Sequence, residues 1–295
     1  MNEFKKYHPI VNFIYFVFVI GFGMFFMHPV CLGISIFCGF AYSVTLKGKK
    51  AIKTNLVYML PMMVAMALIN PAFNHEGVTI LTYLPSGNPL TAESIVYGVA
   101  AAAMIVSVIC WFSCYNEVMT SDKFIYLFGK IIPALSLILS MTLRFVPKFI
   151  AQLKVVANAQ RCIGRDASGG SIVQRTKSAL SILSIMTTWA LENAIETADS
   201  MRSRGYGMPG RTAFSIFAFD KRDKKALALI LILGIYTLVG GVLGGIYFNY
   251  FPSIKTAKLS VYGVSLFVSY FALCIYPVII ELLEVRRWNA LKSKI

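Results

Sequence analysis

The chain has 295 residues, of which 57% are hydrophobic and only 14% charged, and its mean hydropathy is +0.69. A soluble domain carries about a quarter charged residues and slightly under half apolar ones, so this composition excludes a soluble globular protein, a disordered chain and a disulfide-stapled secreted module. The formal net charge is +15. The positions of the basic residues predict orientation in the membrane, because the basic loops of membrane proteins stay on the cytoplasmic side.

Six apolar segments approach the roughly 20 residues that a membrane-spanning helix needs. They cover residues 10–27, 30–46, 54–70, 93–115, 226–249 and 259–280. The sequence therefore predicts an all-α integral membrane protein with about six transmembrane helices.

The distribution of basic residues predicts the orientation. Lys5, Lys6 and the four lysines of loop 47–53 place the N-terminus and the first inner loop in the cytoplasm, whereas residues 71–92 contain neither Lys nor Arg. Basic residues also flank both ends of the last two spans, although the loop between those spans carries two lysines. We expect a multi-pass protein of the cell (cytoplasmic) membrane with both termini in the cytoplasm.

The middle of the chain is too basic to cross the membrane. Between Arg144 and Lys225 there are 14 Lys or Arg and 6 Asp or Glu. We therefore interpret 124–145 as an in-plane or shallow re-entrant helix. The expected regions are an N-terminal transmembrane region (1–123), a cytoplasmic or interfacial helical region (124–225) and a C-terminal transmembrane hairpin (226–295).

Residues 171–204 are typical of a one-sided helix. Small and apolar residues recur there at three- and four-residue steps, a pattern that suits close approach of a partner helix in lipid. They are Leu180, Leu183, Thr187, Ala190, Ala194 and Ala198. A span at 178–198 is the alternative, but three acids lie between 192 and 199, and each would cost about 2.5–3.5 kcal/mol at the bilayer centre.

The chain lacks the motifs that would give it chemistry of its own. No phosphate-binding G-x-x-x-x-G-K-[ST] loop and no H-E-x-x-H or G-x-S-x-G motif occurs, and the six cysteines show no metal-ligand spacing. Glu281 and Glu284 have two interpretations. They are either a membrane-protease or proton-relay pair, or, more simply, part of an ion-paired helix end. Glu192 and Glu196 share a helix face, but without a histidine they make a poor zinc site. We predict no catalytic residue, metal or cofactor.

Two stretches of the basic region repeat one another. Residues 157–164 (ANAQRCIG) and 198–205 (ADSMRSRG) share Ala, Arg and Gly at positions one, five and eight. Each ends a predicted helix in glycine, a natural C-terminal stop, with arginine favoured in the last turn by the helix dipole. Such ends are interpreted either as docks for two similar partners or as ordinary basic caps.

These stretches, together with Met141–Pro147 (MTLRFVP), Asp166, Tyr206-Gly207 and Gly210-Arg211-Thr212, resemble the T component of energy-coupling factor (ECF) transporters. That family includes the Q-type transmembrane subunit of cobalt transporters. The resemblance implies a non-catalytic transmembrane scaffold of an ABC-type vitamin or metal-ion importer. Its coupling helices would dock on two ATPase subunits, which hold ATP and Mg, and would contact one small substrate-binding membrane subunit in the lipid bilayer. No nucleic acid is implied.

The resemblance assigns site residues to both helix ends. The ATPase-docking motifs would be Ala159, Gln160, Arg161, Cys162, Ile163, Gly164 and Arg165 at the first end, and Ser203, Arg204 and Gly205 at the second. The substrate-binding subunit would contact Leu180, Leu183, Thr187, Ala190 and Ala194. The first motif departs from the Ala-Arg-Gly pattern because Ile163 stands where the arginine is expected. Either Arg161 or Arg165 supplies that charge, or the first dock is mostly apolar.

Two other functions remain open from the sequence. A self-sufficient permease would need no partner, although the spans carry few of the ionisable residues that coupled carriers place at mid-membrane. An intramembrane enzyme would rely on Glu281 and Glu284. The resemblance implies that substrate specificity lies in the separate binding subunit, and the scaffold is either shared by several such subunits or dedicated to one.

Overall fold

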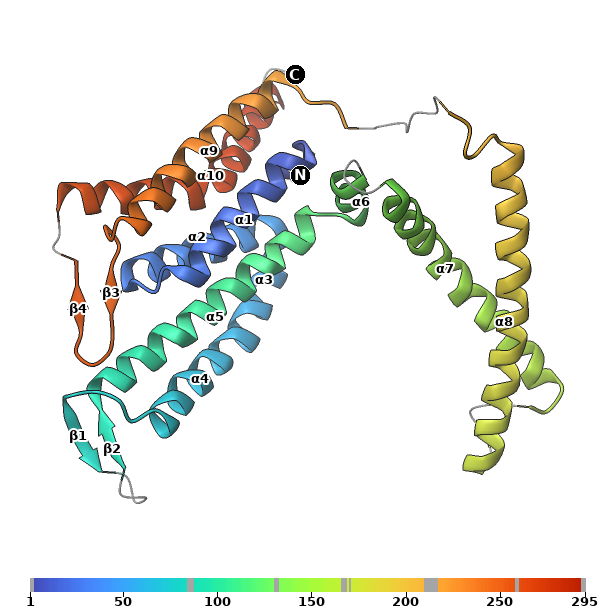
Figure 1. The fold of residues 1–295 in the computed structure, drawn as a ribbon, viewed down its shortest axis with the longest axis horizontal. Coiled ribbons are helices and arrows are strands. Elements are labelled where there is room, and N and C mark those ends of the chain that lie inside the picture. Colours follow the sequence, from blue (N-terminus) through green and yellow to red (C-terminus); the bar gives the residue numbers. More distant parts are fainter. Residues whose placement is uncertain are drawn as a thin grey trace. The chain divides into compact units, whose positions relative to one another are not determined.

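The computed structural model describes residues 3–83, 88–129, 133–165, 169, 171–209, 217–257 and 260–292. Apolar helices carry the chain back and forth (Figure 1). They are α1 (Pro9–Phe25), α2 (Pro29–Lys47), α3 (Lys49–Thr54), the single π-helical turn η2 (Asn55–Met59), α4 (Leu60–Phe73), α5 (Ala92–Val118), α9 (Lys221–Val242) and α10 (Val261–Lys292). A 3₁₀ turn, η1 (Phe4–Lys6), precedes them.

The remaining elements are three helices and two short hairpins. The helices are α6 (Ser121–Gly129), α7 (Pro133–Cys162) and α8 (Ile172–Ser203). Strands β1 (Ile80–Tyr83) and β2 (Pro89–Thr91) pair antiparallel with Ile80 opposite Thr91, and β3 (Phe248–Asn249) pairs with β4 (Lys255–Thr256). The predicted all-α class is therefore confirmed.

Five stretches are long and apolar enough to cross a membrane, by length and composition. They are Pro29–Lys47, Ala51–Phe73, Ala92–Val118, Lys221–Val242 and Val261–Lys292, while Pro9–Phe25 is a shorter apolar helix of 17 residues. These helices overlap the six predicted segments, although α9 already ends at Val242 and α10 continues to Lys292. The chain is a multi-pass integral membrane protein.

The first two helices begin in the same way. His8 and His28 each precede a proline at the first helical position, where its missing N–H is not needed. The Nδ1 of His8 accepts the N–H of Ile10 at 3.3 Å, and that of His28 accepts the N–H of Val30 at 3.2 Å. The histidine imidazole therefore caps both helices, which explains why α2 begins directly after His28.

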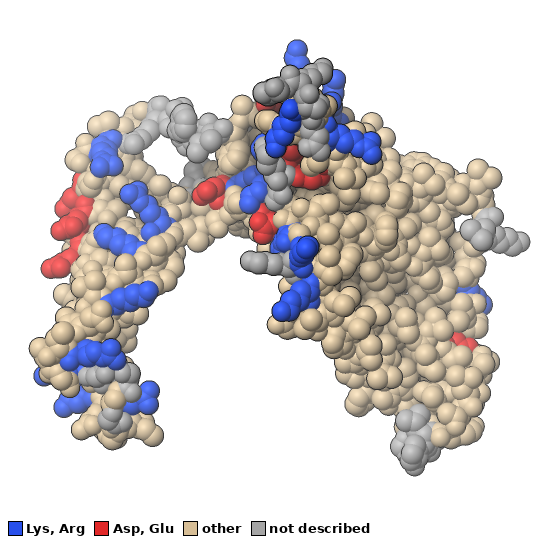
Figure 2. Space-filling view, turned by 180° about the vertical axis from the view of Figure 1, so that it is seen from behind, with Lys and Arg blue, Asp and Glu red and all other residues tan. Residues whose placement is uncertain are grey.

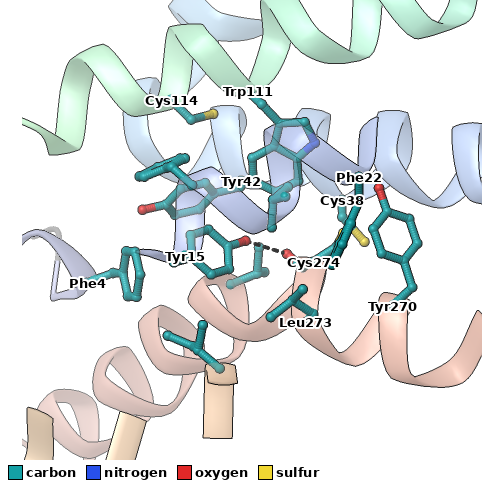
Figure 3. Close-up of a cluster of buried hydrophobic side chains, with 14 of the residues drawn as sticks. Phe4, Tyr15, Phe22, Cys38, Tyr42, Trp111, Cys114, Tyr270, Leu273 and Cys274 are labelled. Carbon is teal, nitrogen blue, oxygen red and sulfur yellow. Dashed lines mark hydrogen bonds between the residues drawn. The ribbon is translucent and has the colours of Figure 1, made fainter. Parts of the chain in front are cut away.

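The chain divides into two compact units, which we call the membrane unit (Met1–Phe124 and Phe217–Ile295) and the helix-pair unit (Ile125–Ile216). The core of the membrane unit is rich in aromatic side chains from α1, α2, α5 and α10 (Figure 3). Tyr15 is fully buried there, and its hydroxyl donates to the carbonyl oxygen of Cys274 at 3.1 Å. The indole of Trp111 is also fully buried, and its Nε1 donates to Ser35 Oγ at 3.0 Å.

Small residues let α9 and α10 approach each other closely. A Cβ atom added at Gly240 would overlap the side chain of Leu266, which is fully buried. Nearby, the hydroxyls of Thr237 and Ser269 lie 3.2 Å apart. Close backbone contact with hydroxyl bridges is typical of helix association in lipid, where no hydrophobic driving force acts between helices.

We predict that Gly240→Ala destabilises the protein whereas Gly21→Ala does not. Alanine gains about 1 kcal/mol of helix propensity at either site, but only at Gly240 does the added methyl meet a neighbour, since nothing lies within 4 Å of the corresponding position at Gly21. Overpacking costs about 1–3 kcal/mol. Thermal unfolding in detergent is expected to show a lower midpoint for Gly240→Ala alone, and equal midpoints would contradict the close α9–α10 packing.

Candidate functional site: two matched helix ends

The helix-pair unit consists mainly of α7 and α8, which cross (Figure 1). Val156 of α7 and Ile182 and Met186 of α8 are buried at the crossing, and the rings of Phe149 and Trp189 meet edge to face with centroids 5.2 Å apart. Contacts that advance along α7 retreat along α8, so the helices are antiparallel. The end of α7 therefore lies beside the first turns of α8, and the end of α8 lies beside the first half of α7.

Both helices end in the same backbone motif. Gly164 and Gly205 each have φ of 76°, a left-handed conformation that favours glycine. At the first end the N–H of Gly164 donates to the carbonyl of Arg161 at 3.1 Å and that of Arg165 to Gln160 at 2.9 Å. At the second end Gly205 donates to Arg202 at 2.9 Å and Tyr206 to Met201 at 3.0 Å. These are two Schellman motifs in one register.

The shared register decides which residues are equivalent. Arg161 corresponds to Arg202, which lies two residues before the C-cap residue of its helix. Ile163 corresponds to Arg204, which is itself the C-cap residue of α8. Residues two apart point in different directions on a helix, so Arg161 does not stand in for the absent cap arginine. The Schellman motif alone does not identify a functional site, because α9 ends in the same motif at Gly244. The two ends of the helix pair are distinguished by their basic, exposed side chains.

The structure leaves most of the expected docking residues accessible. Gln160 and Gly205 are half-buried, and the other eight are exposed: Ala159, Arg161, Cys162, Ile163, Gly164, Arg165, Ser203 and Arg204. Ile163 is 64% exposed, a large apolar side chain at a helix tip. The two ends thus present different chemistry at one backbone position, an aliphatic side chain on α7 and a guanidinium on α8.

A groove of about 660 Å³ runs beside Arg204. It is lined by Met141, Arg144, Phe145, Lys148, Asn193, Glu196, Thr197, Ser200, Met201 and Arg204. The Nζ of Lys148 donates to Asn193 Oδ1 at 2.6 Å and lies 5.5 Å from the Trp189 ring. Three cations against one carboxylate make the groove electropositive, and Figure 2 shows basic side chains along the helix pair with acidic ones gathered at one edge.

A second groove, of about 530 Å³, lies beside the first helix end. Its lining is polar and comprises Gly164, Arg165, Gly169, Gln174, Lys177, Ser178 and Ser181. Helix α8 begins there with a capping box, in which Gln174 N–H donates to Ser171 Oγ at 3.4 Å and Ser171 N–H donates to Gln174 Oε1 at 3.3 Å. Each helix end is thus accompanied by a groove that the other helix completes.

The residues expected to contact a substrate-binding subunit lie away from the α7–α8 crossing. Leu180 and Leu183 are 61% and 62% exposed, Thr187 and Ala194 are exposed, and Ala190 is half-buried. Leu191 and Ile195, 62% and 64% exposed, extend the same face. Helix α8 therefore uses one face to pack on α7, and the residues that the structure describes leave its second apolar face uncovered.

The acidic residues considered for catalysis make structural contacts. Glu281 is buried, and its Oε2 accepts the N–H of Glu3 at 2.9 Å. Glu284 lies 3.5 Å from the guanidinium of Arg287. Among the described residues no cluster of three or more His, Cys, Asp or Glu side chains is placed to hold a metal ion.

The sequence did not predict every contact at the helix ends, and part of the predicted motifs lies outside the described residues. The contact between Lys148 and Asn193 joins positions 45 residues apart, and no local pattern signals it. Asp166 and Gly210-Arg211-Thr212, part of the resemblance, lie outside the described residues.

Comparison with known proteins confirms the resemblance. The chain is 36% identical over 100 residues to the energy-coupling factor transporter transmembrane protein EcfT of Lactobacillus helveticus, a match that covers 34% of this chain and 36% of the relative. It is 34% identical over 103 residues to the protein of that name from Streptococcus equi, covering 35% and 38%. The EcfT protein of Acidaminococcus fermentans is 30% identical over 168 residues, covering 53% and 62%.

These relatives are curated homologues of the chain and are named as the transmembrane protein of an ECF transporter. The matched segments span about two fifths of the length of the first two relatives. No protein-family model matches the chain.

We predict that Gly164→Ala and Gly205→Ala fray the helix ends. Alanine in the left-handed conformation costs about 1–2 kcal/mol, which corresponds to roughly 5- to 30-fold faster local opening. Hydrogen exchange of residues 158–165 and 199–206 measures this. Gly33→Ala is the control, because Gly33 lies within α2 with nothing within 4 Å of an added Cβ. Unchanged exchange at both ends would contradict the Schellman assignment.

Proposed function

We propose that the chain is the transmembrane scaffold of an ECF-type importer of a vitamin or metal ion. In this proposal the ends of α7 and α8 dock on two ABC-type ATPase subunits, which hold ATP and Mg, while the uncovered face of α8 contacts a small substrate-binding membrane subunit. The chain itself is not an enzyme and holds no cofactor. Both termini are cytoplasmic, and α7 and α8 lie on that side of the bilayer.

One observation carries the proposal: two exposed helix ends of identical backbone geometry lie in one register at the two far ends of an antiparallel pair. A dimer of similar ATPase subunits offers two similar docks, and a pair of matched ends suits it. The names of the curated relatives support the same assignment. The chain lacks a phosphate-binding loop of its own, so the energy would come from partner subunits.

The second end is proposed to bind through charge. Arg204 occupies the cap position beside the electropositive groove, and its planar guanidinium suits a carboxylate on the partner. The first end is proposed to bind through apolar contact, since Ile163 occupies the equivalent position and is 64% exposed.

We predict that Arg204→Glu reduces capture of co-expressed ATPase subunits more than Arg161→Glu does. Breaking a hydrogen-bonded charge pair in an interface costs about 2–5 kcal/mol, enough for at least a roughly tenfold loss of affinity. Affinity purification of the chain in detergent, with quantification of the bound ATPases, measures the effect. Lys154→Glu is the matched control, because Lys154 is an exposed base of α7 away from both ends. Equal retention by all three variants would count against the docking assignment.

We predict that Ile163→Ala also weakens capture, but by a loss that salt does not change. Removing an interfacial aliphatic side chain forfeits up to about 2 kcal/mol, whereas the contribution of Arg204 should shrink at high salt because ions screen exposed charges. Capture is measured for both variants at low and high ionic strength. If the Ile163→Ala defect also vanishes in high salt, Arg161 or Arg165 carries the first dock instead.

A further inference from the structure

An apolar groove of about 440 Å³ lies along one face of α9 in the membrane unit. The described residues that line it are Lys225, Ala228, Leu229, Ile232 and Leu233. They recur at steps of three and four residues, so they share one face of the helix. Leu229 and Ile232 are 42% and 68% exposed. The groove therefore opens on the outer surface of the membrane unit.

The groove exists because position 228 carries alanine. The side chain of Ala228 is the smallest on this face, and it leaves space between the turns that carry Lys225 and Ile232. Leu233 packs against the aromatic core of the membrane unit, so it closes the groove on the inner side. A larger residue at position 228 would fill this space.

The dimensions of the groove suit a lipid chain. Helix α9 is long and apolar enough to cross a membrane, so the groove belongs to a membrane-spanning segment. From Lys225 to Leu233 it runs about 12 Å along the helix axis, at about 1.5 Å per residue. That length is most of one leaflet of a hydrocarbon core roughly 30 Å thick.

Positive charge gathers at one end of the groove. The first five residues of α9 include four exposed bases, which are Lys221, Arg222, Lys224 and Lys225. The acid within this run, Asp223, is 3% exposed, and its Oδ1 accepts the N–H of His8 at 3.3 Å. Asp220, exposed at the N-cap, offsets only part of the charge. The exposed surface at the start of α9 is therefore basic.

Lys225 stands where this basic run meets the apolar part of α9. The apolar residues begin directly after it, at Ala226. Within the part of the chain that the structure describes, Lys225 forms no ion pair with an acid. A lysine in this position lays its aliphatic stem along apolar surface and keeps its ammonium at the level of the lipid headgroups.

We propose that this groove is a binding site for an anionic phospholipid. One acyl chain lies against Ala228, Leu229 and Ile232, and the phosphate lies at Lys225. Lys221, one turn earlier on the same face, adds a second positive charge. Clusters of four or more bases directly beside a membrane span are typical of sites for anionic headgroups. The ammonium of a zwitterionic headgroup would instead meet these lysines. The inference concerns the membrane unit alone and does not depend on the proposed function.

The test places a tryptophan beside the groove. Ile235→Trp is the reporter, because Ile235 is exposed on α9 and does not line the groove. The full chain is reconstituted in vesicles of equal amounts of phosphatidylglycerol and phosphatidylcholine. One of the two lipids carries brominated acyl chains, which quench nearby tryptophan fluorescence. The signal of the chain without the reporter is subtracted, and the ratio of the two quenching efficiencies gives the headgroup preference at the groove.

We expect brominated phosphatidylglycerol to quench the reporter more strongly than brominated phosphatidylcholine. Lys225→Gln in the reporter chain should lower this preference about fivefold, the size expected for one base beside an anionic headgroup. Lys224→Gln is the matched control: it removes the same charge about 100° around the helix axis and should have a clearly smaller effect. Ala228→Leu keeps every charge but fills the groove, and it should also lower the preference.

Three outcomes would overturn the inference. Equal quenching of the reporter by the two lipids would mean that only ordinary boundary lipid contacts α9. Absence of quenching by either lipid would mean that protein covers the groove. Equal losses for Lys225→Gln and Lys224→Gln, or an unchanged preference in Ala228→Leu, would mean that diffuse surface charge attracts the lipid without a site. None of these measurements involves the ATPase subunits, so failure here leaves the docking assignment untouched.

Discussion

The crossing of α7 and α8 is the contact on which the candidate site depends. Three buried side chains and one aromatic pair hold two long helices together. Most of each helix remains exposed. Because the contact is small and antiparallel, it sends the two glycine-capped ends in opposite directions and completes a groove beside each. A parallel crossing would have brought the two glycine-capped ends together at one end of the helix pair.

The membrane unit is held by a different kind of interaction. Lipid offers no hydrogen bonds to exposed polar groups, and several polar side chains inside the unit pair with one another, as Trp111 and Ser35 do. Small residues then allow close helix contact, as at Gly240. At one end of this unit the buried polar groups are charged side chains. Lys123, Asp223 and Glu281 are buried there, and each forms a hydrogen bond with the backbone of residues 3–8. Two of these buried charges, Lys123 and Asp223, lie close in sequence to the points where the chain leaves and re-enters the membrane unit.

The two helix ends share a backbone and differ in their side chains. Isoleucine stands at one cap position and arginine at the other, and the side chain changes the chemistry of the helix end without altering its geometry, because the Schellman motif depends on glycine and on backbone hydrogen bonds. Within the proposed function, this asymmetry suits two ATPase subunits that resemble each other without being identical. The curated relatives named EcfT are suitable sequences with which to compare this cap position.

The sequence by itself determined the apolar helices, the turn at His28-Pro29 and the equivalence of residues 157–164 and 198–205, because hydrophobic length, proline and glycine act locally. It also identified Arg204 and Ile163 as equivalent positions. Only the tertiary structure decided which face of α8 packs on α7, which grooves accompany the helix ends, and that Lys123, Asp223 and Glu281 converge on residues 3–8. Those contacts join positions up to 278 residues apart. Their partners are set by the packing of whole helices, and no local periodicity encodes them.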